Sequence, residues 1–174
     1  MACLMPGCAA PGMSRPLPPA AEQGRVLLDV PFYPDDTDQC GPSALASVLG
    51  FWGRTAEPGR IKEEIYRPEL KGSLPVDLLL AAQAHGMTAE MPDETLDSLR
   101  HELDAGHPVI AFVNQGYRFL PIGHYLVVTG YDDRRGTLFA HSGTKKNDPV
   151  PYEKFLRQWE RTDRWTLLIL PAAL

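Results

Sequence analysis

The sequence predicts an α+β fold, with helices in the first half of the chain packed on an antiparallel sheet formed by the second half. Between residues 41 and 105 apolar side chains recur at helical spacing, and from residue 109 onward short β-type runs take over. A chain of 174 residues, with 44% hydrophobic and 22% charged residues, is long enough to form one domain with its own core.

The first half is expected to contain one short strand followed by four helices. The apolar run 26–30 is a strand closed by Pro31, and residues 41–43 open a helix that continues to about residue 52. One face of this helix is apolar and carries Ala44, Leu45, Val48, Leu49 and Trp52. The remaining helices are expected at 57–67, 73–85 and 95–105, with Ser73 as an N-cap and Gly86 and Gly106 as helix stops.

The second half is expected to be mostly sheet. Strands are predicted at 109–113, 125–131, 137–140 and 165–170, and one helix at 152–159. The polar residues 132–136 are typical of a turn, so the two strands around them should form a hairpin. That hairpin would bring residues 141–144 close to residue 124.

The N-terminal segment differs in composition from the rest of the chain. Residues 1–24 are rich in proline, alanine and glycine, which predicts a disordered leader ahead of a domain at 25–174. Residues 4–8 resemble the end of a bacterial lipoprotein signal, in which the cysteine, here Cys8, carries the lipid. A lipidated Cys8 would anchor the protein to a membrane of the cell envelope; otherwise the segment is a tail and the protein is expected to be cytoplasmic.

Charge and cysteine content exclude several classes of function. The net charge is -5 and no run of Lys or Arg exceeds two residues, so nucleic acid is not an expected partner. The three cysteines Cys3, Cys8 and Cys40 have spacings that favour neither a disulfide framework nor a zinc site, and no cofactor is expected. No apolar stretch approaches the roughly 20 residues that span a bilayer.

Cys40 is the candidate nucleophile because it lies where a loop meets the start of the first predicted helix. A helix N-terminus favours the thiolate, and its unpaired N–H groups can bind an oxyanion. Gly41 would leave room for the backbone of a substrate. The competing interpretation is a small buried hydrophobic residue, which is what a lone cysteine usually is.

A nucleophilic cysteine needs a histidine that takes its proton. Of the five histidines, His124 is the candidate because it directly precedes an apolar strand, where its side chain would be held rigidly. The alternative is an ordinary loop histidine. The nearby aromatic residues Tyr117, Phe119 and Tyr125 would either line a substrate groove or pack in the core.

Three segments together resemble a known family. They are Asp-Val-Pro-Phe-Tyr at 29–33, Gln-Cys-Gly-Pro-Ser-Ala-Leu-Ala at 39–46 and Gly-His-Tyr-Leu-Val-Val-Thr-Gly-Tyr-Asp at 123–132. In this order and spacing, over roughly residues 26–170, they resemble the papain-like cysteine peptidases of family thirty-nine, which cleave double-glycine leaders of bacteriocins. The resemblance implies a papain-like fold, a peptide or protein substrate, and hydrolysis through an acyl-enzyme with Cys40 as nucleophile and His124 as general base and acid.

Two positions depart from the pattern of this family. A glutamine that helps to form the oxyanion hole commonly lies five or six residues before the cysteine, where this chain has Pro34 and Asp35. An anionic Asp35 would repel an oxyanion, so Gln39 or main-chain N–H groups would have to serve. The family has an aspartate after the strand that follows the histidine motif; here Ser142 stands in as the orienting residue, or that residue is absent. A Ser-Gly-Thr at this place is similar to a stand-alone subgroup of lipoproteins, which fits Cys8.

The leading hypothesis is a cysteine peptidase that cleaves exported peptides, at glycine-rich sites, through Cys40 and His124. The alternative is a catalytically impaired papain-like module that binds peptides in the cell envelope, because the expected glutamine and aspartate are missing. A third hypothesis is another acyl-transfer enzyme with the same pair of residues, such as a transglutaminase or a deamidase.

Overall fold

The structure is a computed structural model that describes residues 24–35 and 37–172. The predicted leader, including Cys8 and its proposed lipid, lies outside the described residues. The described part forms an α+β fold, as predicted, in which one helix-rich half covers a seven-stranded antiparallel sheet. Among the described residues no helix is both long and apolar enough to cross a bilayer.

Five α-helices occur where the sequence predicts them. They are α1 (Cys40–Phe51), α2 (Pro58–Ile65), α3 (Pro75–Ala84), α4 (Leu96–Asp104) and α5 (Tyr152–Trp159), joined by the short 3₁₀ turns η1 (Pro68–Leu70) and η2 (Glu160–Thr162). The predicted cap at Ser73 is wrong: Leu74 is the residue that precedes α3, and Pro75 occupies its first position. Gly86 and Gly106 follow the ends of α3 and α4 with φ of 76° and 86°, the left-handed conformation expected of helix stops.

The strands are β1 (Arg25–Leu27), β2 (Met87–Glu90), β3 (Val109–Asn114), β4 (Gly123–Asp132), β5 (Thr137–Ser142), β6 (Lys145–Pro151) and β7 (Thr166–Pro171). Their order in the sheet is β2-β7-β3-β4-β5-β6, and β1 pairs with the end of β4. The predicted hairpin of β4 and β5 is present. Sequence reasoning missed β2, which has only four residues, and β6, a polar edge strand with two prolines and no apolar alternation.

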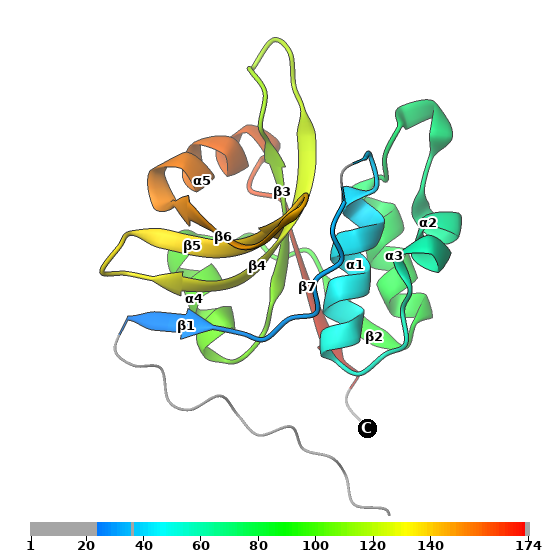
Figure 1. Cartoon of the computed structure of the whole chain (residues 1–174), viewed down its shortest axis with the longest axis horizontal. Helices are drawn as coiled ribbons and strands as arrows, with labels where there is room; N and C mark the ends of the chain where they lie inside the picture. The colour runs from blue at the N-terminus through cyan, green and yellow to red at the C-terminus, as the bar shows by residue number, and fades with distance from the viewer. Residues whose placement is uncertain (1–23, 36, 173–174) are drawn as a thin grey trace, which may run out of the picture.

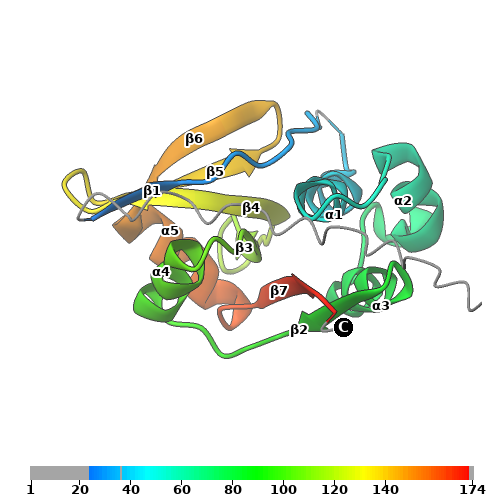
Figure 2. The same ribbon diagram turned by 90° about the horizontal axis from the view of Figure 1, so that it is seen from below.

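Helix α1 lies between the sheet and the other N-terminal helices. It packs on β3 and β4, while α2 and α3 cover its outer side (Figure 1). Seen from below, α4 and α5 lie on the opposite face of the sheet (Figure 2). The alternation of side chains along β4 agrees with this arrangement, since Val127 lies near α1 and Leu126 lies near α5.

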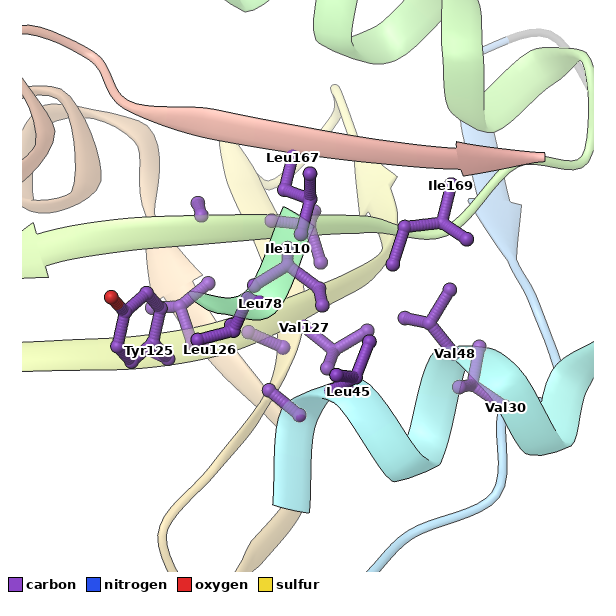
Figure 3. Packing of buried hydrophobic residues seen from close by; sticks show 14 of the residues in the cluster. Val30, Leu45, Val48, Leu78, Ile110, Tyr125, Leu126, Val127, Leu167 and Ile169 are labelled. Atoms are coloured by element: carbon purple, nitrogen blue, oxygen red, sulfur yellow. The ribbon is translucent and has the colours of Figure 1, made fainter. Parts of the chain in front are cut away.

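The core explains why α1 is fixed in place. Figure 3 shows Leu45 and Val48 of α1 directed toward Ile110 and Ile169 of the sheet, and all four side chains are fully buried. Residues 41–49 of α1 are buried without interruption, so the helix is enclosed on all sides rather than along one apolar face. A helix enclosed in this way cannot shift without opening cavities in the core.

A buried histidine ties the segment before α1 to the sheet. His141 of β5 is 5% exposed, and its Nε2–H donates to the Val30 carbonyl at 3.0 Å. Its Nδ1 accepts from the Asn147 main-chain N–H at 3.2 Å, so both ring nitrogens have partners only in the neutral imidazole. Burial accordingly lowers the pKa of His141. Because Val30 precedes the loop that leads to Cys40, this contact helps to place that loop.

The loop between β3 and β4, residues 115–122, projects beyond the sheet (Figure 1) and exposes apolar side chains. The rings of Tyr117 and Phe119 stack 5.5 Å apart, and both are largely exposed. At its base the Asn114 Oδ1 accepts hydrogen bonds from the N–H groups of Gly116 and Ile122, at 2.9 and 3.0 Å. The loop is therefore held at its base by the Asn114 side chain, together with the Arg161 guanidinium, which donates to the Gly116 carbonyl.

Gly130 permits the close approach of β1 to β4. It lies at a register shift of β4, next to both Leu27 and Phe139, and a Cβ built on it would overlap the carbonyl oxygen of Val26. We expect Gly130→Ala to push β1 off the sheet and to lower the free energy of unfolding by about 1–3 kcal/mol, as overpacking does.

Gly59→Ala is the matched control, because Gly59 lies in α2 and a Cβ added to it would meet no other atom within 4 Å. It should change stability by less than about 1 kcal/mol, in the stabilising direction. Urea denaturation of the two variants measures both effects, and equal stabilities would contradict the assigned role of Gly130.

Candidate active site

Cys40 is the first residue of α1, where a loop turns into the helix. The preceding residue, Gln39, ends the loop, and its carbonyl accepts the N–H of Ser43 at 3.0 Å. Cys40 is a free, half-buried cysteine. The 12-residue helix behind it directs its unpaired N–H groups toward the thiol end of the residue.

The sulfur of Cys40 lies against the edge of β4. In the ladder between β3 and β4, Phe112 is opposite Tyr125, but the Phe112 N–H donates away from β4 to Trp165. The Phe112–Tyr125 pair is therefore of the non-hydrogen-bonded type, in which the Tyr125 N–H points away from β3. Cys40 and Tyr125 line the same hollow, and the Tyr125 main chain acts to lower the pKa of the Cys40 thiol. Cys40 thus lies beside the residue that follows His124.

Burial raises the pKa of the Cys40 thiol, and the negative charge of Asp35 raises it further. Hydrogen bonds from the main chain of Tyr125, of Gly41 and of Cys40 itself oppose this shift but do not cancel it. The helix N-terminus favours the thiolate, as expected from the sequence, but burial has the larger effect on the pKa. Loss of hydration outweighs the helix dipole at this position.

Gly41 has a different role from the one predicted. Its missing side chain does not leave a gap for a substrate, because a Cβ at this position would lie 3.0 Å from both Cβ and Oγ of Ser73. The glycine instead allows the segment before α3 to pack on the first turn of α1. The Tyr125 hydroxyl donates to the Ser73 carbonyl at 3.0 Å and fixes the same segment from the sheet side.

His124 is the second residue of β4 and is half-buried. Its Nε2 is 2.9 Å from the Oγ of Ser142, at the end of the neighbouring strand β5. Burial lowers the pKa of His124, and the charge of Asp35 partly offsets this by raising it. The imidazole is consequently neutral near pH 7, with one ring nitrogen engaged by Ser142 and Nδ1 left for another partner.

Asp35 and Gln39, the two residues considered for the oxyanion hole, lie in one hydrogen-bonded turn. Asp35 Oδ1 accepts from the N–H and the Oγ1–H of Thr37, at 3.0 and 2.8 Å. The Gln39 amide donates to the Thr37 Oγ1 at 2.8 Å. The structure therefore places Asp35 at the site and turns the side chain of Gln39 toward Thr37.

Two hollows meet at these residues. The smaller, about 20 Å³, is lined by Cys40 together with Phe32, Tyr33, Asp35, Ser43, Ala44, Ser47, Tyr125, Val127, His141, Ser142 and Gly143. The larger, about 760 Å³, is lined by His124 and by side chains of β6 and α5. Asp35, Ser142 and Gly143 border both hollows, so they form the boundary between the surroundings of Cys40 and those of His124.

Of the aromatic residues near His124, only Tyr125 has one of the predicted roles, and neither Tyr117 nor Phe119 lines the hollows of Cys40 and His124. Tyr125 is buried in the core, whereas Tyr117 and Phe119 are exposed on the loop 115–122. Sequence reasoning missed the main-chain N–H of Tyr125 and the imidazole of His141 as parts of the site, since neither a strand edge nor a pairing register is visible in residue types. Among the described residues no three His, Cys, Asp or Glu side chains converge to hold a metal ion.

The helices packed on an antiparallel sheet, with Cys40 at the start of α1 and His124 at the start of β4, form a papain-like peptidase fold. Residues 27–166 match the model of the Peptidase_C39 like family, which is most of the chain, and the protein belongs to that family. No curated protein sequence matches the chain.

Solved structures of peptidases of this family share the fold. A double glycine motif protease from an AMS/PCAT transporter, solved in complex with the leader peptide, is 21% identical and has a TM-score of 0.68, covering 87% of this chain and 97% of its own. A C39-like peptidase from Bacillus anthracis is 17% identical, with a TM-score of 0.70 over 86% and 99% of the two chains. The peptidase domain of Streptococcus ComA, a bi-functional ABC transporter in quorum sensing, is 22% identical, with a TM-score of 0.62 over 82% and 98%.

The raised pKa of Cys40 predicts a characteristic pH profile of alkylation. Because only the thiolate reacts, the half-maximal rate of labelling by iodoacetamide should occur at higher pH in the native protein than in urea. The measurement uses a protein with Cys3→Ser and Cys8→Ser, so that Cys40 is the only thiol. A native half-maximal pH below that of the unfolded protein would contradict the assignment.

The contact between His124 and Ser142 predicts a second titration effect. Ser142→Asp places a charge beside Nε2, stabilises the imidazolium and should raise the pKa of His124 by about one unit or more. Ser142→Thr keeps the hydroxyl and is the matched control, with an unchanged pKa. NMR titration of the imidazole measures both; equal values for the Asp and Thr variants would show that residue 142 does not contact the ring.

Proposed function

We propose that the protein is a cysteine peptidase that hydrolyses peptide bonds through an acyl-enzyme, with Cys40 as nucleophile and His124 as general base and acid. The observation that carries the proposal is the position of Cys40 at the N-terminus of α1, beside Tyr125, the residue that follows His124, with Asp35, Ser142 and Gly143 bordering the hollows of both residues. Membership of a peptidase family and the shared fold support the same reaction class.

The protonation states favour attack by general base catalysis rather than by a preformed ion pair. The thiol is protonated because its pKa is raised, and the imidazole is neutral because its pKa is lowered. In the proposed reaction the Cys40 proton passes to Nδ1 of His124 as the sulfur bonds to the carbonyl carbon of the substrate. Nε2–H then donates to Ser142, whose hydroxyl holds the ring in the required tautomer.

The remaining steps use the same two groups. The tetrahedral intermediate collapses, the C–N bond breaks, and the imidazolium gives its proton to the leaving amine. Water then attacks the thioester while His124 accepts its proton, and the carboxylic product leaves as the thiol is restored. Since Ser142 carries no charge, the imidazolium is less stabilised here than beside an aspartate, which predicts a slower first step than in such a site.

Main-chain N–H groups are the best-placed hydrogen-bond donors for the oxyanion of the intermediate. The main-chain N–H groups of Cys40 and Gly41 are close to the sulfur. N–H groups in the first turn of a helix have no carbonyl acceptor within the helix, so these two can bind an oxyanion. The Gln39 amide would first have to leave Thr37. We therefore assign the role of the expected glutamine to the N-terminus of α1.

The proposed substrate is an exported peptide or an envelope protein cleaved after a glycine pair. The support is the family and its double glycine motif protease, which was solved with a leader peptide bound. Anchoring to the cell envelope through lipid on Cys8 belongs to the same proposal and depends on the motif in the sequence alone.

The decisive experiment measures cleavage of quenched peptides that contain a Gly-Gly pair, with products identified by mass spectrometry. Cys40→Ala and His124→Ala should each lower kcat/KM by roughly a thousandfold or more, because the two groups act in one proton transfer. Cys3→Ala is the matched control and should retain the activity.

The other hypotheses correspond to distinct results of this experiment. Peptide binding by the wild-type protein without turnover would identify a binding module and overturn the proposed peptidase. Ammonia release from glutamine side chains, with an intact peptide backbone, would identify a deamidase or a transglutaminase instead.

A further inference from the structure

Asp35 is held rigidly at the junction of the two hollows. Its main-chain N–H donates to the Gly143 carbonyl at 3.0 Å, and its Oδ1 accepts two hydrogen bonds from Thr37. Within residues 24–35 and 37–172, the second carboxylate oxygen accepts no hydrogen bond and Asp35 has no ion-pair partner. One oxygen of a fixed carboxylate is therefore free to receive a positively charged group.

The charge of Asp35 acts on both reacting residues. It raises the pKa of the Cys40 thiol and also that of His124. The residue borders the hollow of Cys40 as well as the hollow of His124, in agreement with these effects. Asp35 is thus near the path of any substrate that contacts Cys40.

An unpaired carboxylate at this place opposes the proposed reaction. Negative charge develops on the Cys40 sulfur and then on the carbonyl oxygen of the substrate, and a neighbouring anion disfavours both. A cation beside Asp35 would remove this penalty. Among the cations of the described residues none pairs with Asp35: Lys145 pairs with Asp148 at 3.6 Å, and Lys154 of α5, which also lines the larger hollow, is exposed.

We propose that Asp35 is a specificity-determining residue that selects substrates with a positive charge next to the scissile bond. The charge would be the side chain of Lys or Arg or the α-ammonium of the peptide, which share the chemistry that a carboxylate recognises. The inference rests on the proposed function, since it takes Cys40 to attack a peptide bond. The substrate then completes the electrostatics of the site: its cation pairs with Asp35 and favours the nucleophilic thiolate.

The first test does not need turnover. In a protein with Cys3→Ser and Cys8→Ser, Cys40 is modified with a cationic methanethiosulfonate, the trimethylammonium-ethyl reagent, or with the anionic sulfonatoethyl reagent. Each reaction forms a disulfide with the Cys40 sulfur and releases methanesulfinate. Relative to the urea-unfolded protein, the cationic-to-anionic rate ratio should be about tenfold higher in the native state.

Two variants attribute that ratio to Asp35. Asp35→Asn keeps the Oδ1 acceptor for Thr37 and removes the charge, so the ratio should fall close to that of the unfolded protein. Asp93→Asn removes an equal charge from an exposed carboxylate that lines neither hollow, and it should leave the ratio unchanged. A native ratio equal to the unfolded one, or a ratio that survives Asp35→Asn, would overturn the inference.

The second test uses quenched Gly-Gly peptides that differ only in Lys or norleucine beside the glycine pair, with acetylated and free N-termini. We expect kcat/KM to be about tenfold higher for the cationic member of a pair, and the difference to vanish in Asp35→Asn. A preference that follows the Lys identifies a side-chain subsite; one that follows the free N-terminus identifies α-ammonium recognition.

The two tests separate this inference from the proposed function. Cleavage of Lys and norleucine peptides at equal rates overturns the inference and leaves the peptidase in place. If none of the peptides is cleaved, the proposed function fails, and the reagent ratio alone decides whether Asp35 selects cations at Cys40.

Discussion

The enclosure of α1 is the constraint on which the rest of the structure depends. Residues 41–49 of the helix are buried between the sheet on one side and α2 and α3 on the other. Its first residue therefore has one position relative to β4, and that position is where β5 no longer pairs with β4. Cys40 lies beside Tyr125 there, and the Tyr125 main chain acts to lower the pKa of the thiol. Packing of apolar side chains thus determines where the polar chemistry occurs.

The site differs from the family pattern in the position of its negative charge. The residue behind His124 is the neutral Ser142, and the carboxylate lies at Asp35, beside both the sulfur and the imidazole. A charge behind the histidine would stabilise the imidazolium without opposing the thiolate. The charge of Asp35 stabilises the imidazolium and also opposes the thiolate, so its net effect on the reaction depends on what binds next to it. This dependence makes the site sensitive to the charge of its ligand.

Much of this arrangement could be predicted from the sequence. Helical and strand periodicity located α1, β4 and β5, and the hairpin argument brought Ser142 beside His124. The role of Gly41 could not be predicted, because its neighbour Ser73 is 32 positions away and comes close only through the packing of α3. The net shift in the pKa of Cys40 could not be predicted, since a helix N-terminus is visible in a sequence whereas the extent of burial is not.

The clamp at the base of the loop 115–122 has a consequence for association. The Asn114 side chain accepts both flanking N–H groups, and the Arg161 guanidinium donates to the Gly116 carbonyl at 2.6 Å. The backbone of the loop 115–122 is thereby already ordered in the folded protein. Binding of another molecule would therefore cost little further backbone entropy in this loop. When a partner binds Tyr117 or Phe119, the entropy lost would therefore be mainly the partner's own, and the partner would have to fit the existing shape of the loop 115–122.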